Sequence, residues 1–223
     1  LVSSLTNKNL PLDTIEALAW GSNLDWGFDK HPPMSAFFLE VFFQMFGPQD
    51  WAYYLLSQIF VLIAFYYVFK FANEILENIK LSLVSVFLLV SIYFYNFTTP
   101  EFNVNVCQLP FWALVVYFSW KIYSSKEIKF LDCFLVGLFA ALGFLSKYLF
   151  VYLLVSIDLL FFYLIFFKKE KKFDFKYLIS IEVFLVLLVP HFIWLYQNDF
   201  ITIIYGIKRT GLEDADILNY IQY

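Results

Sequence analysis

Acidic, basic and amide side chains suited to chemistry on a phosphorylated substrate recur in a few short polar stretches of the chain. Carboxylates can take a proton from a hydroxyl nucleophile, and lysines can hold a phosphate by charge. Amides and imidazole add hydrogen bonds to a polar substrate. The candidate residues are Asp13, Glu16, Lys30, His31, Glu101, Asn103, Asn105 and Lys147.

The composition shows which solvent surrounds these side chains. Hydrophobic residues make up 61% of the 223-residue chain and charged residues 15%. A water-soluble protein of this size could not cover so much apolar surface, so lipid is the expected solvent. Cys107 and Cys133 stand in apolar surroundings without metal-site spacing. No basic stretch is typical of nucleic-acid binding, so the expected partner is the bilayer.

Long apolar runs predict helices that cross the bilayer. About 20 residues are needed for a crossing, and a helix satisfies its own backbone in hydrocarbon. Six runs come near this length, and the first is ended by Lys70. They are Trp51–Phe69, Leu81–Phe97, Val104–Trp120, Phe130–Ser146, Tyr148–Phe167 and Tyr177–Tyr196.

Two shorter segments before these runs predict helices that lie in the membrane interface. Residues 33–46 are apolar but too short to span, and Glu40 and Gln44 share one face. Residues 12–20, LDTIEALAW, form the second predicted short helix. The expected fold is an all-α polytopic membrane protein with two helices flanking the bundle.

Lysine and arginine in the loops indicate the orientation of the bundle. If residues 1–50 are outside, 10 of the 15 basic residues fall in inner loops, including the run KKEKK at 168–172. Cytoplasmic loops carry such an excess, so this orientation is favoured. It brings all eight candidate residues to the outer face.

Simpler structural explanations stand beside the functional ones. Lys147 can be a lysine that extends its ammonium to water, and Lys30-His31-Pro32-Pro33 can be a helix-start signal with incidental charges. Asp13 can be an acidic residue favoured near a helix N-terminus.

Four motifs together resemble family 39 glycosyltransferases, the relatives of protein O-mannosyltransferases and of the lipid A aminoarabinose transferase. LDTIEALAW and WGFDKHPPM (26–34) are similar to the first extracytoplasmic loop of that family. TPEFNVN (99–105) looks like its second outer loop, GFLSKY (143–148) resembles its G-x-x-L-[ST]-K motif with one residue fewer, and PHFIWL (190–195) is similar to a later element.

The resemblance implies a GT-C fold, with transmembrane helices and two juxtamembrane helices in the first outer loop. Members of that family are longer, so we expect this chain to be a fragment that lacks a first transmembrane helix and a C-terminal half. The expected organisation is a periplasmic catalytic loop at 1–50, a six-helix transmembrane region at 51–197 and a periplasmic loop at 198–223.

The resemblance also implies residue roles. Asp13 matches the general base, Glu16 its partner acid, and Glu101 stands where many relatives have aspartate. Lys30 and Lys147 match lysines that hold the phosphate leaving group, and His31 matches the H of HPP. Asn103 and Asn105, in the TPEFNVN segment that carries Glu101, are further candidates for binding the substrate. A divalent cation held by Asp13, His31 and Glu101 is left open.

The expected function is therefore inverting transfer of a sugar from a polyprenyl-phosphate donor to a glycolipid, such as lipid A, or to a protein. The expected location is the bacterial inner membrane, with the active site facing the periplasm. The alternatives are a transporter or flippase for a lipid-linked or small polar substrate, and a membrane scaffold. No internal repeat is found and the polar residues lie at one face, which favours the enzyme over the transporter.

Overall fold

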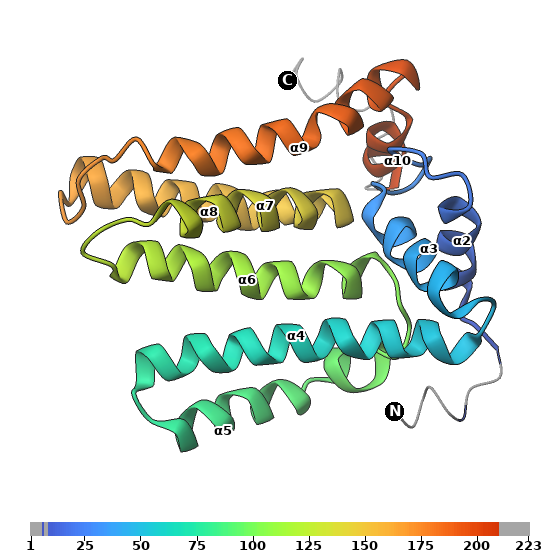
Figure 1. Ribbon diagram of the computed structural model, residues 1–223, viewed down its shortest axis with the longest axis horizontal. Helices are drawn as coiled ribbons and strands as arrows, with labels where there is room; N and C mark the ends of the chain where they lie inside the picture. The colour runs from blue at the N-terminus through green and yellow to red at the C-terminus, as the bar shows by residue number, and fades with distance from the viewer. Residues whose placement is uncertain (1–5, 7–8, 210–223) are drawn as a thin grey trace, which may run out of the picture.

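The computed structural model describes residue 6 and residues 9–209, and the described part is built from helices (Figure 1). Six of them run back and forth as a bundle, which confirms the predicted all-α polytopic class. Their bounds are α4 Asp50–Leu76, α5 Ile79–Val90, α6 Val104–Ser124, α7 Phe130–Ser146, α8 Val151–Phe162 and α9 Tyr177–Gln197.

The outward faces of the bundle are apolar, as lipid contact requires. Leu62 on α4, Phe87 on α5 and Val186 on α9 are 65%, 69% and 62% exposed. Three helical stretches are long and apolar enough to cross a membrane by length and composition: Asp50–Leu76, Tyr148–Phe167 and Tyr177–Gln197. The helices α5 and α7 have 12 and 17 residues, so the six-span count stays a prediction.

The second predicted run, Leu81–Phe97, is not one continuous α-helix. α5 ends at Val90, and a π-helical turn, η1 Phe94–Thr98, follows after a bend. The Ser91 hydroxyl donates to the Leu88 carbonyl at 2.6 Å, and the Asn96 amide donates to the Val90 carbonyl. Side chains thus occupy carbonyls that the next helical turn would use, and such competition bends or ends helices.

The first run, in contrast, continues past the lysine predicted to end it. α4 extends from Lys70 to Leu76, because its charges find partners on α6. The Lys70 ammonium lies 4.9 Å from the centre of the Tyr117 ring, and Glu74 accepts hydrogen bonds from Tyr117 and Lys121. Cation–π and ionic contacts of this kind keep a charged turn helical beside an apolar bundle.

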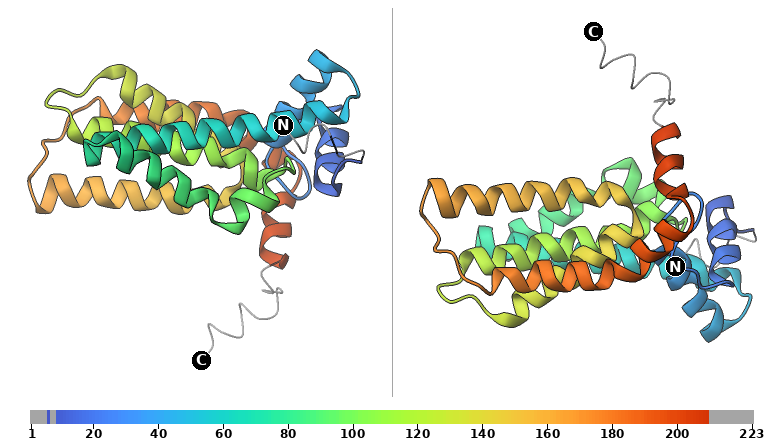
Figure 2. Two further views of the ribbon diagram at one scale, coloured as in Figure 1. Left: turned by 90° about the horizontal axis from the view of Figure 1, so that it is seen from below. Right: turned by 90° about the horizontal axis from the view of Figure 1, so that it is seen from above.

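Two short helices cross one end of the bundle (Figure 2). They are α2 Leu12–Gly21 and α3 Met34–Phe46, and they confirm the helices predicted at 12–20 and 33–46. A third short helix, α10 Ile201–Arg209, lies at the same end and occupies the start of the predicted loop at 198–223. The rest of that loop lies outside the described residues. We call this end the α2–α3 end.

Aromatic packing holds α3 and the loop before α6 against the bundle. The ring of Phe38 on α3 lies 4.9 Å from that of Phe60 on α4, and Phe60 lies 5.2 Å from Phe102, between ring centres. Phe102 is 1% exposed. Close-packed aromatic side chains of this size fix the elements they join, so the polar loops at the α2–α3 end rest on a rigid base.

Candidate active site

The acids of α2 stand beside the loop that precedes α6. Asp13 and Glu16 are three residues apart on one face of α2, with Asp13 exposed and Glu16 half-buried. The buried Thr14 hydroxyl donates to the Phe102 carbonyl at 3.1 Å. This bond joins α2 to residues 99–103, so acids from segments far apart in the sequence share one place.

Glu101 lies against Asp13. Burial, followed by the negative charge of Asp13, raises the pKa of Glu101, and a hydrogen bond from the Asp13 backbone N–H opposes the rise. Two neighbouring carboxyl groups that differ in environment can divide the roles of proton acceptor and proton carrier. The structure thus brings together the two acids that the sequence placed in separate loops.

Lys30 is paired with the second acid of α2. Its ammonium lies 2.5 Å from Glu16 Oε1, and this hydrogen bond raises the pKa of Lys30. Sequence reasoning assigned the two residues to different tasks, phosphate binding and acid partner. In the structure the charge of each is balanced by the other.

His31 is neutral at pH 7. Burial, followed by the positive charge of Lys147, lowers its pKa to about 4. Its neighbours line a small cavity of about 20 Å³, whose polar lining residues are Asp13, Glu16, His31, Ser35 and Asn103. A neutral imidazole at this position can accept or donate a hydrogen bond but does not carry charge to a substrate.

Asn103 and Asn105 have distinct local tasks. The Asn103 side chain caps α6, since its Oδ1 accepts from the backbone N–H groups of Asn105 at 2.9 Å and Val106 at 3.2 Å. Asn105 Oδ1 accepts from the Lys147 ammonium at 2.5 Å. Asn103 therefore fixes the start of α6, and Asn105 directs Lys147.

Lys147 stands at the junction of α7 and the next helix with extended backbone, at φ −163° and ψ 131°. Burial, followed by the positive charge of Arg209, lowers its pKa from the ordinary value. A half-buried lysine whose contact is a neutral amide keeps its charge available to an anion. Arg209, at the end of α10, adds a second positive charge to this side of the site.

His191 links the two segments that carry the lysines of the site. No sequence motif indicated this connection. The fully buried His191 on α9 has Nδ1 2.5 Å from the Trp26 carbonyl and Nε2 2.7 Å from the Tyr148 hydroxyl. The carbonyl fixes the tautomer with hydrogen on Nδ1, so Tyr148 donates to Nε2. Because Tyr148 follows Lys147 and Trp26 precedes Lys30, one imidazole positions both lysine-bearing segments.

The loop that carries Lys30 and His31 is also held by α10 and by close packing. Thr202 on α10 donates to the Phe28 carbonyl at 2.5 Å. A Cβ on Gly27 would come within 2.3 Å of the Trp194 ring, so this approach requires glycine. The PHFIWL motif contains both His191 and Trp194, whereas no motif marks Thr202.

The metal left open in the sequence finds no assembled ligand set. In residues 6 and 9–209, no group of three or more histidine, cysteine, aspartate or glutamate side chains could hold a metal ion. Asp13, His31 and Glu101 therefore do not form such a group.

An apolar cavity of about 560 Å³ opens beside the site, between α4, η1 and α6. Asn105 lies at its polar edge, so the lysine–amide contact of Lys147 adjoins it. Its other lining residues include Phe65, Leu89 and Trp112. A second apolar cavity of about 330 Å³ between α4, α6 and α8 shares Phe71 and Val116 with the first.

Comparison with known proteins agrees with this architecture. The model of the dolichyl-phosphate-mannose-protein mannosyltransferase family matches residues 30–194, from the HPP segment to α9. No curated protein and no solved structure matches the chain. The family match covers most of the 223 residues, although α2 with Asp13 and Glu16 precedes it. The chain therefore belongs to the dolichyl-phosphate-mannose-protein mannosyltransferase family and is a membrane glycosyltransferase of the GT-C type.

Proposed function

We propose that this protein transfers a sugar, with inversion, from a polyprenyl-phosphate donor to a hydroxyl group of a glycolipid, such as lipid A, or of a protein. The observation that carries the proposal is that a charged region and an apolar cavity meet at Asn105. On one side lie Lys147 and the acids Asp13 and Glu101, and on the other the apolar cavity of about 560 Å³. A lipid-linked phosphosugar also combines a polar part, the sugar phosphate, with an apolar part, the lipid chain.

Asp13 is the proposed base. It is exposed at the site, and its charge faces that of Glu101. In the proposed step, Asp13 takes the proton of the acceptor hydroxyl, whose oxygen forms a bond to the anomeric carbon. The bond from that carbon to the phosphate oxygen breaks, and the phosphate leaves with the electron pair. General bases of this kind contribute about 10² to 10⁴ in rate.

Lys147 is the proposed phosphate ligand. Its ammonium is directed by Asn105 toward the edge of the cavity, and Arg209 adds charge on the same side. Negative charge grows on the phosphate as it leaves, so a fixed cation there stabilises the transition state. The family resemblance implies a similar role for Lys30, which would have to leave Glu16 to take part.

The apolar cavity is the proposed place for the isoprenoid chain of the donor. It lies between helices of the bundle, and its lining, like that of the neighbouring cavity of about 330 Å³, is predominantly apolar. An apolar lining suits a hydrocarbon chain and disfavours passage of a polar cargo. This favours the transferase over a transporter or flippase. With the lysine-rich loops on the cytoplasmic side, the site would face the periplasm of a bacterial inner membrane.

Transfer in detergent tests the proposal. The purified protein is incubated with radiolabelled polyprenyl-phosphate mannose and, separately, with lipid A or a serine- and threonine-rich peptide. We expect label on one acceptor, and loss of that labelling in Asp13→Asn. Equal labelling by wild type and Asp13→Asn would reject the base. Vesicle uptake of substrate without any glycosyl product would support the transporter instead.

A further inference from the structure

Ser35, in the first turn of α3, has a buried hydroxyl without a partner. Its side chain is 0% exposed, and its Oγ makes no hydrogen bond to any residue that the structure describes. Buried polar atoms in native proteins are nearly always hydrogen-bonded, and an exception calls for a ligand or a water. A buried hydroxyl without a hydrogen bond is costly, so a group that satisfies it should lie in its surroundings.

The cavity beside Ser35 has room for one oxygen-sized group. Its volume is about 20 Å³, and Ser35 lines it with Asp13, Glu16, His31 and Asn103. A single water needs roughly 10–15 Å³ of such space and two to four polar partners. The cavity therefore has the size and the lining for one hydroxyl or water oxygen, and no room for a sugar ring.

The charges of the lining indicate which oxygen fits. Asp13 and Glu16 would repel an anion, so a phosphate oxygen is disfavoured there. The neutral His31 and the hydroxyl of Ser35 suit a neutral group that both accepts and donates hydrogen bonds. The N-terminus of α3, which no side chain caps, adds a weak preference for an electron-rich oxygen.

We propose that this cavity holds the reacting hydroxyl of the acceptor, with Ser35 as a substrate-contacting residue. The Ser35 hydroxyl donates to a lone pair of the acceptor oxygen, while the acceptor proton points to Asp13. In the resting protein one water takes the same place. The assignment rests on the proposed function, because it supplies the nucleophile that Asp13 deprotonates. The bonds formed and broken are those of the proposed sugar transfer, and Ser35 keeps its own proton throughout.

This position explains how a shallow, exposed acid can act on one hydroxyl among many. Asp13 is exposed and does not by itself select an orientation. A second contact from the rigid N-terminal turn of α3, next to Pro32 and Pro33, fixes the acceptor oxygen relative to the base. Fixing a nucleophile near its attack geometry lowers the entropic part of the barrier.

The test measures kinetic constants for acceptor and donor separately, in the transfer assay described above. The variants are Ser35→Ala and Ser35→Cys, whose thiol is a weak donor. The matched control is Ser82→Ala, a buried serine of α5 that donates to the Asn78 carbonyl away from the site. We expect kcat/KM for the acceptor to fall roughly tenfold in Ser35→Ala and less in Ser35→Cys, with KM for the donor unchanged.

Each other outcome has a defined meaning. Unchanged kcat/KM for the acceptor in Ser35→Ala overturns the inference, whether or not the melting temperature moves, because a structural water alone would then fill the cavity. A tenfold rise in KM for the donor, or the same loss in Ser82→Ala, also overturns it. Absence of transfer by the wild type overturns the proposed function, and the inference with it.

Discussion

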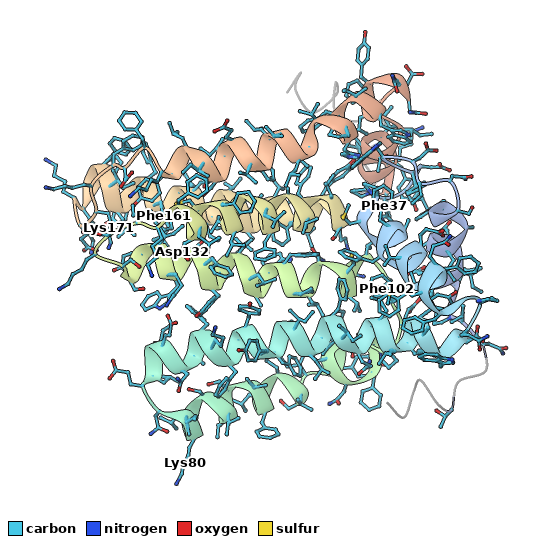
Figure 3. All side chains as sticks on the ribbon, in the orientation of Figure 1. Phe37, Lys80, Phe102, Asp132, Phe161 and Lys171 are labelled. Carbon is cyan, nitrogen blue, oxygen red and sulfur yellow. The ribbon has the colours of Figure 1, made fainter. Side chains whose placement is uncertain are left out.

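Charged side chains have different surroundings at the two ends of the helical bundle. At the end opposite α2 and α3, where Figure 3 labels Lys80 and Lys171, several lysines contact nearby groups. Lys168 lies 3.5 Å from Glu170, and Lys176 donates to the Ile128 carbonyl at 2.9 Å. At the α2–α3 end, charges and amides from five segments meet around a cavity of about 20 Å³ and beside an apolar one of about 560 Å³. The first pattern is typical of loops at a membrane surface, and the second is the one expected of an active site.

The same contrast appears in burial. Lys168 and Glu170 keep side chains that are 51% and 44% exposed, so water screens their contact and little free energy is gained. His31 and Lys147 are partly buried, and burial shifts the pKa of each toward the neutral form. Shifts of this kind cluster at functional sites, so variants at the two ends should separate activity from simple anchoring.

The largest expected difference is between two aspartates. Asp13→Asn should lower kcat for sugar transfer by about 10² to 10⁴, since the base is lost while the shape of the exposed side chain is kept. The control at the opposite end is Asp174→Asn, which should keep full activity. Initial rates with a saturating donor measure both. Equal rates for Asp13→Asn and the wild type would show that Asp13 is not the general base.

Two lysines give the next difference. Lys147→Gln should lower kcat about 100-fold, because a fixed cation no longer meets the phosphate as its charge grows. Lys171→Gln removes a lysine that donates to the Ser125 carbonyl at the opposite end, and should leave kcat unchanged. Comparison of the two rates is the measurement. Similar losses in both variants would indicate a general effect of charge removal.

Stability should depend on pH through His31. The folded protein holds its pKa at about 4, below the ordinary value of 6.5, so the unfolded chain binds more protons between these values. Stability should therefore fall as pH drops from 6.5 to 4, by about 2 kcal/mol after allowance for partial exposure. Thermal unfolding in detergent measures the fall, and His31→Gln should reduce it. An equally steep profile in His31→Gln would assign the dependence to other groups.

The smallest effect is expected at the tyrosine that contacts His191. Tyr148→Phe leaves Nε2 of a fully buried imidazole without its donor, so it should lower the free energy of unfolding by about 1 kcal/mol and kcat/KM about fivefold. Tyr152→Phe, at an exposed position of α8, is the matched control. Unfolding curves and initial rates check both. If Tyr148→Phe changes neither the free energy of unfolding nor kcat/KM, Trp26 alone positions His191.

Helices were the part of this protein that the sequence predicted best. Apolar runs located α6, α7 and α9 closely, since length and hydropathy in lipid follow from composition. The bend at Ser91 was missed, because it depends on which carbonyl a side chain takes. The extension of α4 past Lys70 was missed as well, because its charges are balanced only by α6.

The sequence predicted which residues lie at the site but not which of them contact one another. The motifs placed Asp13, Glu101 and Lys147 in outer loops, and the structure brings these loops to one end. The pairing of Lys30 with Glu16 and the orphaned hydroxyl of Ser35 are tertiary facts. No local pattern marks them, since serine at the start of a helix is common for other reasons.

Photo-crosslinking of the donor tests most directly whether the α2–α3 end is the active site. A polyprenyl-phosphate sugar with a photoreactive group near the phosphate is irradiated with the protein in detergent, and the labelled peptides are sequenced. The account predicts label in residues 99–113 and 143–150, around Asn105 and Lys147, with competition by unlabelled donor. Label confined to residues 124–129 and 168–177, at the opposite end, would contradict it.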